Sequence, residues 1–140
     1  MKKVNVGIIG TGISARYRHL PSYRLDGRCK VIAVMSRNLE NAKSFAFKFG
    51  IPKYYDDLDA FLKNDLDVVS ICTPPYTHKE LAIRCMERGI NVLVEKPMAM
   101  SSADACEMLT KSRKYCVKMS ICHNYLFSNS VTRLDKLISN

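Results

Sequence analysis

Short apolar runs alternate with longer segments of mixed polarity along this chain. Five runs of mostly apolar residues stand at 4–9, 30–35, 67–72, 91–95 and 116–122, and a shorter one surrounds 54–55. Runs that are apolar throughout are typical of parallel strands, which are buried on both faces of a sheet. The segments between them are amphipathic, as expected of helices that cover such a sheet. The pattern therefore predicts six parallel strands joined by helices.

Residues that bend, cap or close helices stand between the predicted strands. The first helix is expected over residues 13–25, with a bend near Pro21, because proline lacks the N–H that a helix interior requires. The other helix starts are predicted from side chains that cap an N-terminus: Asn38, Asp56 or Asp57, Thr77 with Glu80, and Ser101 with Asp104. Two of these helices are expected to end at Gly50 and Gly89, and a last helix is predicted over residues 128–138.

The order of strands and helices predicts the topology. Parallel strands joined by helices require crossover connections, which are right-handed. Six strands connected in this way predict an α/β fold, a doubly wound, mainly parallel Rossmann sheet with helices on both faces and strand order 3-2-1-4-5-6. The 140 residues fit one domain and contain no repeat or linker, so residues 1–140 are assigned to one domain.

A glycine loop follows the first predicted strand. Residues 10–15 have the pattern G-x-G-x-x-A at a strand-to-helix turn. The first glycine permits the tight turn, the second allows a pyrophosphate to approach the backbone, and the alanine lets the helix pack close to the sheet. The helix N-terminus offers free N–H groups to phosphate. We expect a dinucleotide to contact this loop through Gly10, Thr11, Gly12, Ile13 and Ser14.

The end of the second predicted strand indicates which dinucleotide binds. An acidic residue at this point would hold the ribose hydroxyls of NAD, but the strand ends in Ser36 and Arg37. Ser36 can donate a hydrogen bond to a 2′-phosphate, and Arg37 can pair with it in a forked geometry. We therefore expect NADP(H) to be preferred, with NAD(H) possible. The alternative is that Arg37 is a surface residue and that either cofactor binds.

Two further strand ends carry a more specific set of motifs. The segments "CTPPYTHKELA", "GINVLVEKPMAMSSADA" and "CHNYLF" follow the glycine loop in order. In these motifs, in their spacing and over essentially the whole chain, the sequence resembles the NAD(P)-binding domain of the glucose–fructose oxidoreductase, inositol dehydrogenase and rhizopine-catabolism (Gfo/Idh/MocA) family. One departure is Leu126, where the family often has arginine after "HNY".

The resemblance implies roles for the residues in these motifs. Thr73 and Pro74 would lie along the cofactor with His78 nearby, and Glu95 would face the nicotinamide ribose. Asn124 is also expected among the cofactor contacts. Lys96 would project toward the nicotinamide and the substrate, so it is also expected to contact the cofactor. It is the implied catalytic residue, because its charge can polarise the reacting hydroxyl or carbonyl.

Two of these roles have structural alternatives. Lys96 is otherwise a surface lysine paired with Glu95, and His78 is otherwise a helix cap or a packing residue. The resemblance also implies a cis peptide bond before Pro97.

The resemblance further implies a second, α+β domain that binds the substrate and that these 140 residues do not include. The expected function is hydride transfer to or from a sugar, polyol or related carbonyl, in an oxidoreductase of which this chain alone is inactive. Homo-oligomers would form through that second domain. The alternative is a non-catalytic dinucleotide-binding or redox-sensing module.

Charge and cysteine content add little to this assignment. Lysine and arginine number 22 against 13 acidic residues, and the formal charge of +9 admits nucleic acid as a less favoured partner, although no recognition motif supports it. Six cysteines form no C-x-x-C pair, so no metal site is predicted and buried free thiols in a reducing cytoplasm are expected. No signal peptide is visible, and no apolar run approaches the ~20 residues that span a bilayer.

Overall fold

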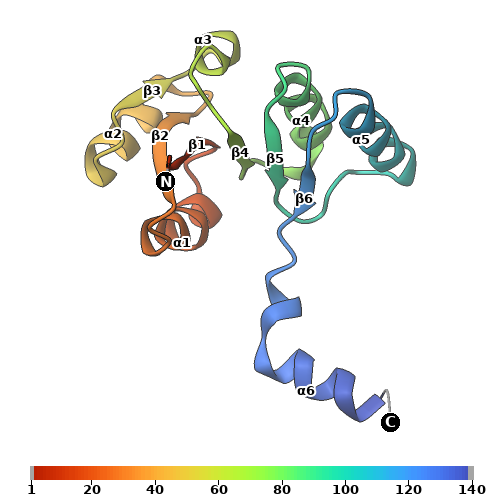
Figure 1. Cartoon of the computed structure of the whole chain (residues 1–140). Coiled ribbons are helices and arrows are strands. Elements are labelled where there is room, and N and C mark those ends of the chain that lie inside the picture. The colour runs from red at the N-terminus through yellow and green to blue at the C-terminus, as the bar shows by residue number, and fades with distance from the viewer. Residues whose placement is uncertain (1, 139–140) are drawn as a thin grey trace.

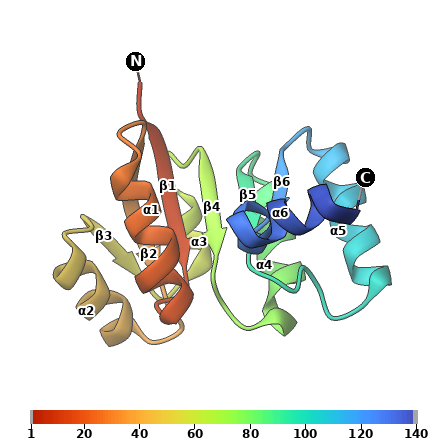
Figure 2. The same cartoon turned by 90° about the horizontal axis from the view of Figure 1, so that it is seen from below.

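The computed structural model describes residues 2–138, which contain one six-stranded sheet of order β3-β2-β1-β4-β5-β6. All five strand pairs are parallel, as predicted. Figure 2 shows the strands side by side in this order, with β3 and β6 at the two edges. The strands are β1 (Val4–Ile9), β2 (Cys29–Met35), β3 (Lys53–Tyr55), β4 (Val68–Ile71), β5 (Asn91–Val94) and β6 (Met119–Ile121).

Helices connect the strands and form the outer layers. They are the π-helical turn η1 (Ala15–His19) that leads into α1 (Leu20–Leu25), then α2 (Leu39–Phe49), α3 (Leu58–Leu62), α4 (His78–Met86), α5 (Ser102–Lys114) and α6 (Asn129–Ile138). Two short 3₁₀ turns, η2 (Pro75–Thr77) and η3 (Asn124–Phe127), precede α4 and α6. The helix α6 extends away from the rest of the domain (Figure 1), and each of its described residues is exposed.

Two apolar clusters lie on opposite faces of the sheet. On one face, η1, α1 and α2 pack on β1 and β2 around Phe45 and Leu20. On the other face, α3, α4 and α5 pack around Phe61, Met86 and Met108. The Phe61 ring of α3 approaches β1 closely at Gly7, where an added Cβ would lie 2.6 Å from the Cζ atom of that ring. The absence of a side chain at Gly7 therefore makes room for Phe61 against the sheet.

The predicted helix signals are confirmed at most positions. The Asn38 side chain accepts a hydrogen bond from the Asn41 N–H, and Gly50 closes α2 in the left-handed conformation. Asp57, the second of the two candidates, caps α3. The bend expected at Pro21 takes the form of the π-helical turn η1 directly before it.

The capping role predicted for Thr77 is wrong. The Thr77 side chain makes no capping bond to α4; its hydroxyl donates instead to Thr73 Oγ1 at 2.7 Å and to the Pro74 carbonyl at 2.8 Å. The cause is the turn η2, which places Thr77 in a helical backbone conformation (φ −98°, ψ −12°) rather than the extended one that a capping residue adopts. Ser101, which is extended, does cap α5 through the Asp104 N–H.

The cysteines are less uniformly buried than expected. All six are free thiols, and Cys85 is fully buried, but Cys106 and Cys116 are exposed. Cys106 belongs to α5, and Cys116 occupies the turn after that helix with a positive φ of 53°. The predicted sixth strand consequently begins later than residue 116, at Met119. Within residues 2–138 no helix combines the length and the apolar character needed to cross a membrane.

Candidate functional site

A cavity of about 290 Å³ opens at the carboxyl edge of the sheet, between the ends of β1, β2 and β4. Seven of the residues predicted to bind a cofactor line it: Gly10, Thr11, Gly12, Ser36, Arg37, Thr73 and Pro74. Six do not: Ile13, Ser14, His78, Glu95, Lys96 and Asn124. The fold thus brings the glycine loop, the end of β2 and the end of β4 to one cavity.

The two glycines of the loop have different surroundings. Gly10 has a φ of +102°, and an added Cβ would lie 2.8 Å from the carbonyl oxygen of Cys72. The Gly10 N–H donates to the Met35 carbonyl at 2.8 Å, so the loop is fastened to β2. Gly12 is exposed, and an added Cβ would have no neighbour within 4 Å. Gly10 is therefore required by the turn, whereas the space beside Gly12 is open to a ligand.

The end of β2 presents an unpaired cation to the cavity. The Ser36 N–H donates to the Tyr55 carbonyl at 3.0 Å, which fixes the backbone. The Arg37 side chain is exposed and has no hydrogen bond or ion pair with the other described residues. Glu80 of α4, predicted to form a capping box with Thr77, also lines the cavity. The acid in the described lining is thus on α4, whereas the residues directly after β2, Ser36 and Arg37, are not acidic.

His78 joins two loops of this edge. Its ring is fully buried, with Nε2 2.8 Å from the Thr73 carbonyl oxygen and Nδ1 2.9 Å from the Pro97 carbonyl oxygen. A neutral imidazole has one N–H and can donate to one of these carbonyls. The ring does not line the cavity, and its two contacts link the loops that follow β4 and β5; a contact between His78 and a cofactor stays a prediction.

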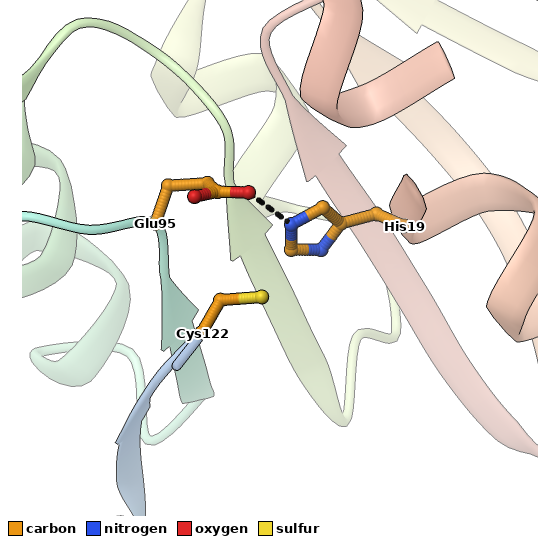
Figure 3. Close-up of side chains that lie close together, drawn as sticks. All are labelled: His19, Glu95 and Cys122. Carbon is orange, nitrogen blue, oxygen red and sulfur yellow. Dashed lines mark hydrogen bonds and ion pairs between the residues drawn. The ribbon is translucent and has the colours of Figure 1, made fainter. Parts of the chain in front are cut away.

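Glu95 follows β5 and is buried in a polar network (Figure 3). Its Oε1 atom lies 3.0 Å from His19 Nε2, and its Oε2 atom accepts from the Lys96 N–H at 3.2 Å. Burial raises the pKa of the Glu95 carboxyl, but hydrogen bonds from His19, Lys96 and Ser14 outweigh burial, and the pKa is lowered. The carboxylate is therefore the stable form at this site.

The network continues inward from His19. Its Nδ1 atom lies 3.3 Å from the Ser70 hydroxyl, which in turn lies 2.6 Å from the Tyr23 hydroxyl. Burial raises the pKa of Tyr23, although the hydrogen bond with Ser70 opposes that shift. The sequence predicted no contact for His19. No local pattern indicates its contact with Glu95, because the two residues lie 76 positions apart along the chain.

Lys96 lies at the carboxyl end of β5 with an exposed side chain. The peptide bond between Lys96 and Pro97 is cis, as the resemblance implied. The contact with Glu95 is made by the Lys96 backbone N–H and not by its ammonium group, so the expected alternative of a surface ion pair is not formed. The Lys96 ammonium is available at the edge of the sheet.

Asn124 lies apart from the main cavity. It is exposed in η3 and lines a second cavity of about 260 Å³ together with His19 and Cys122. Ile13 is 74% exposed at the start of the first helix, whereas the Ser14 side chain bonds to Glu95. Five of the six remaining predicted residues therefore lie about the end of β5 rather than in the glycine loop cavity, and Ile13 is exposed beside the loop.

Among residues 2–138, one group of three potential metal ligands lies close together. His19, Glu95 and Cys122 each offer one ligand atom, and these atoms all lie within 4.8 Å of one another (Figure 3). No metal site was predicted, because that prediction rested on the absence of closely paired cysteines in the sequence.

Comparison with known proteins identifies relatives of the whole chain. The D-glucoside 3-dehydrogenase of Escherichia coli is 31% identical over 138 residues, which cover 98% of this chain and 39% of that protein. The chain spans between 27% and 40% of the length of the first curated relatives that it matches. These relatives carry names of dehydrogenases and oxidoreductases, apart from one yeast protein.

Solved structures share the same fold. The 3-ketoreductase KijD10 from Actinomadura kijaniata, in complex with NADP and TDP-benzene, superposes with a TM-score of 0.91 at 25% identity over 99% of this chain and 42% of that one. GenD2 from gentamicin A biosynthesis, in complex with NAD, also gives a TM-score of 0.91 at 25% identity, over 98% of this chain and 39% of its own. Both nicotinamide cofactors thus occur among the structural relatives.

A family profile settles the relationship. The profile described as an oxidoreductase family with an NAD-binding Rossmann fold matches residues 4–123. The chain therefore belongs to the Gfo/Idh/MocA family of oxidoreductases, of which it carries the NAD-binding Rossmann domain.

Proposed function

We propose that this chain is the cofactor domain of an oxidoreductase that prefers NADP(H) and transfers hydride to or from a sugar, polyol or related carbonyl. The observation that carries the proposal is the cavity in which the glycine loop meets Ser36 and Arg37. The residues directly after β2, Ser36 and Arg37, are not acidic and would not repel a 2′-phosphate, and the Arg37 guanidinium has no partner among the described residues. A phosphate there would receive charge-assisted hydrogen bonds.

The same cavity suits the other parts of a dinucleotide. The open space beside Gly12 allows a pyrophosphate to approach the backbone at the start of the first helix. Thr73 and Pro74 line the opposite wall, at the end of β4. Ligands of doubly wound sheets bind at this switch point, where the strand order reverses. The proposed preference for NADP(H) over NAD(H) rests on Ser36 and Arg37 alone, because structural relatives have been solved with either cofactor.

Lys96 is proposed as the catalytic residue. A bound nicotinamide would donate or accept the hydride. In reduction the carbonyl oxygen would gain negative charge as hydride arrives, and in oxidation the hydroxyl oxygen would become negative as its proton leaves. The exposed Lys96 ammonium at the end of β5 can stabilise that charge. Glu95 holds the Lys96 N–H, and His78 holds the Pro97 carbonyl, so the backbone on both sides of the lysine is fixed.

The substrate would be bound outside this domain. The relatives are more than twice as long as this chain, which supports a second, α+β domain with the substrate contacts, through which homo-oligomers form. The name D-glucoside 3-dehydrogenase supports a sugar-like substrate. The six free thiols support a reducing, cytoplasmic location.

A titration of the chain with NADPH and NADH, followed by nicotinamide fluorescence, tests the cofactor assignment. The wild type is expected to bind NADPH more tightly. Arg37→Ala should weaken NADPH binding by about 1.5–3 kcal/mol, or about 10- to 150-fold, because a charge-assisted hydrogen bond is lost. NADH binding should change little.

The matched control is Arg113→Ala, which removes an exposed arginine from α5, a helix that contributes no residue to the cavity lining. It should alter neither affinity beyond the general effect of one surface charge. Equal affinity of the wild type for both cofactors would refute the NADP(H) preference while leaving a dinucleotide site. Failure of both cofactors to bind would contradict the cofactor domain itself.

A further inference from the structure

His19, Glu95 and Cys122 reach one point from three separate elements. His19 ends η1, Glu95 follows β5, and Cys122 follows β6, yet their ligand atoms lie within 4.8 Å of one another. Figure 3 shows the imidazole, the carboxylate and the thiol turned toward a common centre. His19 and Glu95 are buried and Cys122 is half-buried, so packing of the fold restrains the three side chains near one another.

We propose that these three residues form a binding site for Zn²⁺. Zinc takes imidazole nitrogen, carboxylate oxygen and thiolate sulfur at about 2.0–2.3 Å in tetrahedral geometry, so its ligand atoms lie roughly 3.2–3.8 Å apart. The His19 Nε2 and Glu95 Oε1 atoms, at 3.0 Å, are already near that separation. The Cys122 Sγ atom lies within 4.8 Å of both, so a shift of about 1 Å brings it to the separation that zinc requires.

The charges of the group match a divalent cation. The Glu95 carboxylate and the Cys122 thiolate together carry two negative charges, which neutralise Zn²⁺. Arg18 lines the neighbouring cavity and Lys96 follows Glu95, and both positive charges would repel Zn²⁺. The two negative ligands are therefore needed to hold the ion. Sites with three protein ligands keep a fourth position open. Here that position faces the cavity of about 260 Å³ that His19 and Cys122 both line.

Ser70 provides the outer contact that orients a histidine ligand. Its buried hydroxyl lies 3.3 Å from His19 Nδ1, the ring nitrogen that does not face Glu95. For Nε2 to bind metal, Nδ1 must carry the proton and donate it to Ser70. The Ser70 hydroxyl can accept this bond and donate its own proton to the Tyr23 hydroxyl at 2.6 Å.

Metal binding balances as a proton exchange without redox chemistry. The S–H bond of Cys122 breaks, the Zn–S bond forms, and the proton passes to solvent. Binding through Nε2 requires the His19 tautomer that carries its proton on Nδ1, and the His19–Glu95 contact gives way to two bonds to zinc. Affinity therefore rises with pH until the thiol proton no longer competes.

Cobalt substitution tests the site on the 140-residue chain itself. Co²⁺ added to the reduced protein should give a thiolate-to-cobalt charge-transfer band and the visible d–d bands of tetrahedral coordination, saturating at one ion per chain. Zn²⁺ should displace it and abolish the spectrum. Cys122→Ser should remove the charge-transfer band, whereas Cys106→Ser, which replaces an exposed thiol of α5, should leave it unchanged.

Two further measurements keep the test decisive. Ser70→Ala should lower Zn²⁺ affinity by about 10- to 100-fold, as loss of an outer hydrogen bond does at other metal sites. On the wild type, Zn²⁺ should protect Cys122 from alkylation, read by mass spectrometry, and should leave Cys106 unprotected, a result that needs no variant to fold. Absence of the charge-transfer band, its persistence in Cys122→Ser, or equal alkylation of Cys122 with and without Zn²⁺ would overturn the proposal.

Discussion

Replacing each of the two loop glycines by alanine separates the demands of the fold from those of a ligand. In Gly10→Ala, the new Cβ would lie 2.8 Å from the Cys72 carbonyl oxygen, at a φ of +102° that side chains rarely adopt. The strained backbone contributes about 1–3 kcal/mol. Displacement of the β4 end to relieve the overlap adds about 1–3 kcal/mol. We expect the free energy of unfolding to fall by about 2–6 kcal/mol.

Gly12→Ala is the matched comparison. Its Cβ meets nothing within 4 Å and its φ is ordinary, so the free energy of unfolding should stay within about 1 kcal/mol of wild type. The methyl group would nevertheless stand where a pyrophosphate approaches the loop. We expect NADPH affinity to fall at least about tenfold, which corresponds to about 1.4 kcal/mol.

Urea unfolding and NADPH titration of both variants measure these effects. The reasoning fails if Gly12→Ala unfolds as easily as Gly10→Ala, because then both glycines serve the turn. It fails equally if Gly12→Ala binds NADPH as the wild type does, because the open space beside Gly12 would then not be the phosphate site.

Two further predictions concern stability. Phe61→Ala should lower the free energy of urea unfolding by about 3–5 kcal/mol, because the ring is fully buried against Gly7 and Tyr55; a loss under about 1 kcal/mol would contradict this packing. Because the pKa of Glu95 is lowered in the folded protein, its carboxylate stabilises the fold at pH values above 4.5, the ordinary pKa of this group. This stabilisation is lost as the pH falls through the pKa of the folded state. Unfolding curves recorded between pH 7 and pH 3 (about the range over which carboxyls titrate) should therefore show a smaller decline for Glu95→Gln than for wild type, and parallel declines would argue against it.

The regular elements were predictable because each depends on local pattern. Apolar runs placed all six strands, and Asn38 and Gly50 marked the two ends of α2. The strand order followed from the doubly wound class of the sheet, to which the glycine loop after the first strand points. Thr77 was misassigned because a capping motif is defined by residue types, whereas capping requires an extended backbone that the preceding prolines do not allow here.

The candidate site was predictable only where a motif carries its own geometry. The glycine loop, Ser36 and Thr73 line one cavity because strand ends of a parallel sheet meet at one edge. The contacts of His19 and His78 were not predictable. Each histidine is buried against a partner on another element, and neither a period nor a spacing in the sequence reports such a contact.

The ring of His78 has a consequence for how the sheet edge moves. Thr73 and Pro97 belong to loops that leave different strands, and one imidazole lies within hydrogen-bonding distance of a carbonyl oxygen of each. Whichever carbonyl accepts the ring N–H, the buried imidazole is in contact with both loops, so we expect neither loop to move far without the other. The loop that carries Lys96 is therefore restrained before a ligand binds against Thr73. Ordering that loop should cost little conformational entropy, so it should subtract little from the affinity of the ligand.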